Sequence, residues 1–320
     1  MMTPVHDQRG LLRALVGDGR PLLALTGLAL IFSGAFAIFQ SATGHFLPQD
    51  VHYLGMTKEE LCDMNQCRIV HFMFHDRVSF GGVLIALGSL YMWLAEFPLR
   101  QGAPWAWWLF ALTGVTGFGS FLAYLGYGYL DQWHLAATLA LLPVYGVGLF
   151  RSYRLVAGPD ASPASLVRPA LLVRWTSGYG LGRACLLVTA VMVIVGGAVI
   201  TYIGMTSVFV PQDLEYMGMS ADQLAAINPR LVPLIAHDRA GFGGALFTTG
   251  VAVLVCTWCG RPSRSLWQVL LWAGGVGFAT AIAVHPVIGY TSFTHLAPAG
   301  VVAALFGVGM TLCYRPMMRS

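Results

Sequence analysis

Charged side chains are scarce in this sequence. Asp, Glu, Lys and Arg together make up 10% of the 320 residues, whereas soluble domains carry about 25%. Hydrophobic residues make up 57%, and the mean hydropathy is +0.68. The shortage of charge excludes an ordinary soluble domain, and repeated apolar runs of roughly 18 or more residues predict a multi-span membrane protein.

Two further features are missing. The net charge of +4 is small and no basic arm is present, so we expect no nucleic-acid partner. No cleavable signal peptide is expected either, because the N-terminal segment is polar through Arg20 and the first apolar run is long enough to span a bilayer.

Eight apolar segments are long enough to be spans. They lie at about residues 21–40, 70–95, 105–127, 131–150, 184–203, 236–258, 266–289 and 293–313. Between the first and second spans, and again between the fifth and sixth, the sequence has a long polar loop. In the first of these loops Thr57 and Glu60 have the spacing of a capping box, which predicts a short helix that begins there.

Two polar blocks occur twice in the chain. Pro48-Gln49-Asp50 is followed by His75-Asp76-Arg77, and Pro211-Gln212-Asp213 is followed by His237-Asp238-Arg239, with a spacing that differs by one residue. Glycine pairs follow each second block. The pattern predicts a tandem duplication and an all-α membrane protein, with eight transmembrane helices arranged as two tandem four-helix bundles in a parallel internal repeat.

Arginine is concentrated at the N-terminus, after the second, fourth and sixth spans, and at the C-terminus, whereas acidic residues gather in the two long loops. The positive-inside rule therefore predicts cytoplasmic termini and outward-facing long loops, as in a multi-pass protein of a bacterial inner membrane. The expected parts are a cytoplasmic segment 1–20, a first repeat 21–151, a linker 152–182, a second repeat 183–314 and a tail 315–320.

Four histidines fall near the outer ends of the even-numbered spans. We expect His75 to face His134 in the first bundle and His237 to face His295 in the second. Histidine pairs at one depth in a bundle commonly hold a haem or a metal ion. The alternative is a structural network of polar groups in a protein without a redox role, such as a small-solute transporter or a scaffold.

Arg77 and Arg239 allow two interpretations. Each can form an ion pair with an aspartate at the outer interface, or each can bind a carboxylate such as a haem propionate. The glycines that follow, at 81–82 and 243–244, favour close helix packing, although a flat ligand could also approach them.

The halves also differ. Cys62 and Cys67 lie in the first long loop and have no counterparts, and a disulfide there could be a loop staple or a redox relay. His71 corresponds to Pro233, and Tyr124 corresponds to His285, which gives the second half an extra ligand candidate beside His295.

Two more cysteines, Cys256 and Cys259, have a redox-like or metal-like spacing, but packing in a helix is favoured.

The layout resembles heme A synthase, a family with eight spans, histidines near the outer ends of spans two, four, six and eight, and often a cysteine pair in the first outer loop. The blocks Cys67-Arg68-Ile69-Val70-His71-Phe72 and His75-Asp76-Arg77-Val78-Ser79-Phe80-Gly81-Gly82 also resemble a family of uncharacterised bacterial eight-span proteins.

The resemblance to heme A synthase implies a cofactor, haem b, in an electron-transfer or oxidoreductase protein. His75, His134, His237 and His295 would be its ligands. Cys62 and Cys67 would match the loop pair. A redox partner and the lipid bilayer are the expected partners.

Overall fold

The computed structural model describes residues 10–122 and 129–319. Within these ranges the chain is helical and contains no strand. The α-helices are α1 (Leu11–Val16), α2 (Arg20–Thr43), α3 (Pro48–Leu54), α4 (Lys58–Asn65), α5 (Arg68–Glu96), α6 (Pro104–Leu122), α7 (Gln132–Val156), α8 (Gly178–Gly204), α9 (Pro211–Met217), α10 (Ala221–Ile227), α11 (Leu231–Cys259), α12 (Arg264–Ile288) and α13 (Phe293–Met318), with a 3₁₀ turn at Pro163–Leu166.

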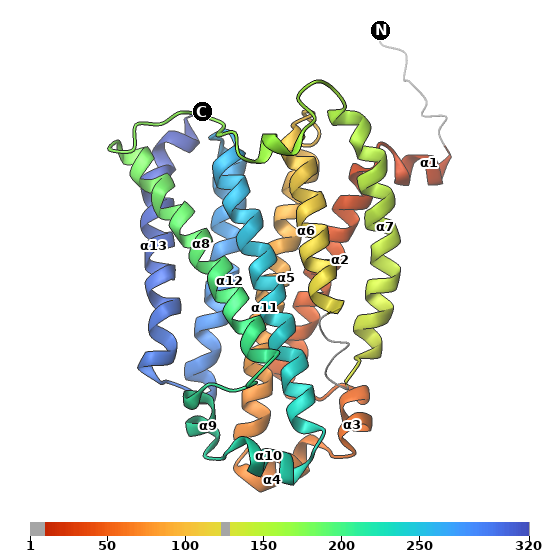
Figure 1. Cartoon of the computed structure of the whole chain (residues 1–320), viewed down its shortest axis with the longest axis vertical. Coiled ribbons are helices and arrows are strands. Elements are labelled where there is room, and N and C mark those ends of the chain that lie inside the picture. The colour runs from red at the N-terminus through yellow and green to blue at the C-terminus, as the bar shows by residue number, and fades with distance from the viewer. Residues whose placement is uncertain (1–9, 123–128, 320) are drawn as a thin grey trace.

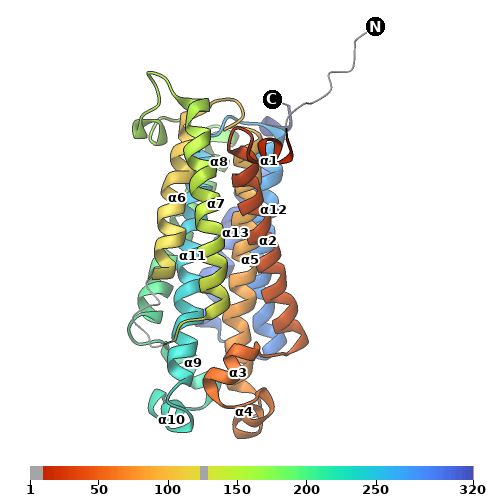
Figure 2. The ribbon, with the colours of Figure 1, turned by 90° about the vertical axis from the view of Figure 1, so that its right-hand side faces the viewer.

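The long helices run side by side along the longest axis of the molecule (Figure 1). The short helices α3, α4, α9 and α10 gather at one end, and α1 and the C-terminus lie at the other (Figures 1 and 2). The end that carries the short helices is the one formed by the two long polar loops, and it is called the loop end below.

Seven of the helices are long and apolar enough to cross a membrane: α2, α5, α7, α8, α11, α12 and α13. They coincide with seven of the eight predicted spans. The remaining prediction, at about residues 105–127, falls on α6 and on residues 123–128, which lie outside the described part of the chain. The described part of α6 is 19 residues long and is not among the seven.

The short helix predicted after Thr57 is confirmed. The Thr57 hydroxyl accepts a hydrogen bond from the Glu60 backbone N–H at 3.3 Å, and the Glu60 carboxylate accepts one from the Thr57 N–H at 2.7 Å. Ser220 and Gln223 cap α10 in the same reciprocal way. These boxes satisfy backbone donors that a helix start leaves unpaired.

Helices α5 and α11 form the centre of the fold. Their most apolar segments are 72% and 67% buried, compared with 11–28% for the other five candidate spans. The outer helices therefore leave most of their apolar surface facing outward, which is the pattern expected of helices that contact lipid.

Glycines bring the outer helices close to this centre. Helix α2 packs on α5, where a Cβ added to Gly81 would lie 2.6 Å from the backbone oxygen of Gly34. Helix α8 packs on α11 in the same way, and a Cβ on Gly243 would lie 2.9 Å from the Gly197 oxygen. The packing interpretation of these glycines therefore matches the structure.

The neighbouring glycines make the next contacts, and these run between the halves of the chain. Gly82 of α5 lies against Thr280 of α12, and Gly244 of α11 lies against Ser120 of α6. Thus α5 packs on α12, and α11 packs on α6. The expectation of two separate four-helix bundles is wrong in this respect, because each half supplies a helix to the central helix of the other.

A matched pair of alanine substitutions tests the close packing of α8 on α11. In Gly197→Ala the new methyl group would lie 2.3 Å from the Phe247 backbone nitrogen, whereas nothing lies within 4 Å of a Cβ at Gly196. Gly197→Ala is expected to destabilise the protein by about 1–3 kcal/mol, which is typical of overpacking. Gly196→Ala gains the same helix propensity without the clash. Thermal unfolding in detergent compares the two variants, and equal melting temperatures would contradict this packing.

Candidate metal centres

The two His-Asp-Arg blocks face each other across the contact between α5 and α11. Arg77 Nε donates to Asp238 Oδ2 at 2.7 Å, and Arg239 Nε donates to Asp76 Oδ2 at 3.3 Å. Each arginine therefore binds the aspartate of the other block. The side chains of Asp76 and Arg239 are almost fully buried, so the pairing is needed to offset the cost of removing these charges from water.

The same arginines hold two of the short helices. Arg77 Nη1 donates to Asp50 of α3 at 2.7 Å, and Arg239 Nη1 donates to Asp213 of α9 at 2.5 Å. Both aspartates are fully buried. We call the six residues the arginine–aspartate network; its members are Asp50, Asp76, Arg77, Asp213, Asp238 and Arg239. Of the two interpretations of the arginines, the ion pair with aspartate is the one that the structure shows.

Two tyrosines complete the coordination of the loop aspartates. Tyr129 donates to Asp50 Oδ1 at 2.9 Å, and Tyr290 donates to Asp213 Oδ1 at 2.7 Å. Burial, together with the adjacent carboxylates, raises the pKa of Tyr129 and the pKa of Tyr290 far above the ordinary tyrosine value. Both tyrosines therefore remain protonated and keep a hydrogen to donate.

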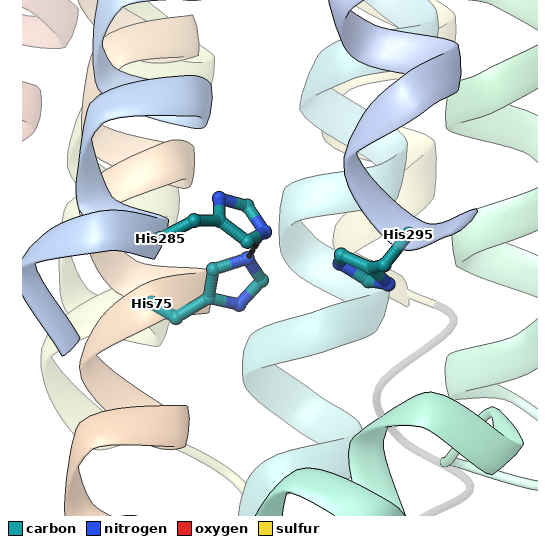
Figure 3. Close-up of side chains that lie close together, drawn as sticks. All are labelled: His75, His285 and His295. Atoms are coloured by element: carbon teal, nitrogen blue, oxygen red, sulfur yellow. Dashed lines mark hydrogen bonds between the residues drawn. The ribbon is translucent and has the colours of Figure 1, made fainter. Parts of the chain in front are cut away.

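Three histidines meet beside this network. His75 of α5, His285 of α12 and His295 of α13 point toward one another (Figure 3), and each offers a ring nitrogen within 4.8 Å of the others. The Nε2 atoms of His75 and His285 are 3.0 Å apart. His75 and His285 are buried and His295 is half-buried. We call this group the three-histidine cluster.

Polar groups outside the cluster lie beside two of its rings. His295 Nδ1 lies 3.1 Å from the Tyr290 hydroxyl, whose hydrogen is directed at Asp213. The hydroxyl oxygen therefore accepts the Nδ1 hydrogen of His295, which leaves Nε2 as the ligand atom. His75 Nδ1 lies 3.0 Å from Asp76 Oδ1. In metal-binding histidines, the ring nitrogen that does not bind the metal typically faces a carboxylate or another acceptor. Such an acceptor fixes the tautomer and raises the basicity of the ligand nitrogen.

A second cluster forms at the equivalent position on α11. His134 Nδ1 of α7 is 3.2 Å from His237 Nε2, and Asp131 supplies a third ligand atom within 4.8 Å of the others. Asp131 also caps α7, since its Oδ1 accepts the backbone N–H of Trp133 at 2.8 Å and of His134 at 3.1 Å. We call this group the aspartate–histidine cluster. Two histidines and one carboxylate form a ligand set used by non-haem iron and by zinc.

The structure pairs the histidines differently from the expectation. His75 of the first half lies with His285 and His295 of the second, and His237 of the second half lies with His134 of the first, so each cluster joins residues of both halves. The pairing of His75 with His134, and of His237 with His295, is therefore wrong. The physical cause is the exchange of α6 and α12. Helix α6 packs on α11 and α7 packs on α6, whereas α12 packs on α5 and α13 packs on α12.

Two ligand candidates carried different signals in the sequence. His285 is recognisable as an addition specific to the second half, and the structure places it beside His295, with ring centres 5.1 Å apart. Asp131 was missed as a ligand. Its signal is its position as an N-cap three residues before His134, which turns its carboxylate toward the start of α7. Tyr124, the counterpart of His285, lies outside the described residues.

The cysteines lie apart from these clusters. Cys62 and Cys67 form a disulfide that joins α4 to the start of α5. Cys256 and Cys259 are free and buried in the last turns of α11, and the Cys259 thiol lies 3.2 Å from the backbone oxygen of Leu166. They are at the end of α11 opposite to His237, so they are not ligands of the same centre.

No protein-family model, curated protein or solved structure matches this chain in comparisons with known proteins. The resemblance to heme A synthase therefore stays a prediction. The described residues define a class by themselves: an all-helical protein of membrane-spanning type with two histidine clusters that could each hold a metal ion.

Removal of one arginine tests the network. Arg239→Met leaves Asp76 and Asp213 buried without their cation, which is expected to cost about 3–5 kcal/mol of stability. Arg168, which pairs with Asp160 on the surface, provides the matched control. Arg168→Met is expected to change stability by no more than about 0.5 kcal/mol. Chemical or thermal unfolding measures the stability of both variants. An equally small loss of stability in Arg239→Met and Arg168→Met would show that the buried network contributes little to stability.

Proposed function

We propose that this protein is an integral membrane metalloprotein with two metal sites, one at the three-histidine cluster and one at the aspartate–histidine cluster. The observation that carries the proposal is that three ligand side chains converge twice, at matching positions on α5 and α11, with their ligand atoms within 4.8 Å. Ionisable side chains within membrane-spanning helices are costly to bury and usually mark a functional site, so two such groups of three favour metal binding.

The ligand sets suggest how the sites would be used. A structural zinc site has four protein ligands, whereas a catalytic site has three and leaves a position for water or substrate. Each cluster has three candidate ligands. We therefore propose that both metals keep an open coordination position, and that they serve a metal-dependent reaction rather than a structural role. Three imidazoles suit zinc or copper, and two imidazoles with a carboxylate suit iron.

Haem b is the second candidate, with an electron-transfer or oxidoreductase role and a redox partner. It is supported by His75 and His295, which come from different helices and whose ring centres lie 6.0 Å apart. It is disfavoured by His285, whose Nε2 atom lies 3.0 Å from the Nε2 atom of His75. An iron bound to His75 Nε2 would lie about 2 Å from it, so His285 occupies space that the iron and its porphyrin ring would need.

We also propose the finer topology. The described part of α6 has 19 residues, which gives about 28 Å of helix and nearly matches a bilayer core of about 30 Å. With α6 as a span the protein has eight, in two repeats, and both termini lie on one side. The arginine-rich ends then face the cytoplasm of a bacterial cell, and the metal sites lie toward the outer face.

Metal content tests the proposal. The purified protein is expected to hold two transition-metal ions, and His75→Ala and His237→Ala are each expected to remove one of them. His45 is an exposed histidine at the same end of the molecule, so His45→Ala is the matched control. Elemental analysis and a cobalt titration give the stoichiometry. If the wild-type protein holds no metal and shows no haem absorption, the histidines are structural and the proposal is wrong.

The role of Tyr290 gives a second test. Tyr290→Phe removes the acceptor for His295 Nδ1 and is expected to lower the metal affinity of the three-histidine cluster by about 10–100-fold. The aspartate–histidine cluster should be unaffected. Tyr202→Phe, on the exposed face of α8, is the control. Competition with a chelator measures the two affinities, and an unchanged affinity in Tyr290→Phe would show that the hydroxyl does not support the site.

A further inference from the structure

A cavity of about 150 Å³ lies among α2, α5, α6, α7 and α11, and His134 forms part of its wall. On α7 the lining residues are His134, Ala137, Thr138 and Leu141, which follow one another at helical spacing along a single face. On α11 the lining begins at Gly241, one turn after His237. The cavity therefore starts at the aspartate–histidine cluster and extends from it along the helices.

Beyond His134 the cavity is apolar in character. Its wall includes Leu30, Leu84 and Phe118. Hydroxyl groups also line it. Those of Thr26, Thr113 and Ser120 donate to backbone carbonyls of their own helices, at 3.0, 2.7 and 2.8 Å. Ser33 and Thr138 add two further hydroxyl groups to a wall that is otherwise mostly apolar. A cavity of this volume accepts an apolar group of about the size of benzene.

The wall formed by α7 is thin. Helix α7, which is described throughout, has buried residues only from Tyr145 onward. Its contact with α2 is at that end, where Gly148 approaches Gly19. Ala137, in the other half, lines the cavity and is also exposed on the surface of the molecule. In a bilayer this part of α7 would face the acyl chains, so the cavity can be reached sideways from the membrane.

We propose that the cavity and the aspartate–histidine cluster form one substrate site for a lipid-like molecule. An oxygen head group of the substrate would bind the metal, and its alkyl chain would fill the cavity after entering past the first half of α7. The inference rests on the proposed metal site and specifies the class of substrate. It follows from the geometry, since a metal ligand at the end of an apolar cavity requires a molecule with one polar end.

A series of straight-chain carboxylates tests this site. The full-length protein is loaded with Co²⁺, and acetate, butanoate and hexanoate are titrated while the visible spectrum of the cobalt is recorded. The affinity is expected to rise about fourfold for each CH₂ that enters the cavity. Gly117→Leu fills the cavity, because a Cβ there has only Thr248 near it, at 3.7 Å. It is expected to abolish the dependence on chain length while the affinity for acetate is kept.

Gly119→Leu is the matched control, since it lies on the same helix with nothing within 4 Å of a Cβ, and it should behave as wild type. If Gly117→Leu fails to bind cobalt, Ala137→Phe fills the cavity from the loosely packed half of α7. If the cobalt-loaded wild-type protein binds all three acids with equal affinity, the proposal of a lipid-like substrate is wrong, but the proposed metal sites are not affected. Wild-type protein that binds no cobalt would overturn the metal sites, and this inference with them.

Discussion

The structure depends on the pairing of buried arginine and aspartate at the centre of the helix bundle. Arg77 and Arg239 each bind one aspartate of the opposite central helix and one aspartate of a short helix at the loop end. A guanidinium removed from water is costly unless its donors meet carboxylates. The two central helices therefore cannot slide or rotate relative to each other without breaking these pairs, so the network fixes their register.

The position of the histidines follows from that register. His75 and His237 are each two residues before an arginine of the network, so the ion pairs that hold Arg77 and Arg239 also set the depth of both histidines. The loop aspartates extend this control. Asp213 binds Arg239 and Tyr290, and Tyr290 binds His295. A continuous chain of hydrogen bonds thus links the charged centre of the fold to a candidate metal ligand on α13.

The small residues decide which helices complete each cluster. At Gly82 and Gly244 there is room for a helix from the other half to approach α5 and α11 closely. Helix α12 packs at Gly82, and α12 and the following helix α13 carry His285 and His295, which meet His75. Helix α6 packs at Gly244, and the following helix α7 carries His134, which meets His237. The two clusters differ in chemistry because one contains His285 where the other has the carboxylate of Asp131 as its third ligand candidate.

Much of the fold is determined locally and could be predicted. Apolar runs of sufficient length form long helices, and Thr57 and Glu60 start α4. Which histidines meet could not be predicted in this way. The sequence alone determined the elements and the histidine ligand candidates, since those depend on neighbours along the chain. Only the tertiary structure decided that each cluster joins both halves. The reason is that the clusters depend on which helix packs against Gly82 and which against Gly244, and these contacts join residues far apart in the chain.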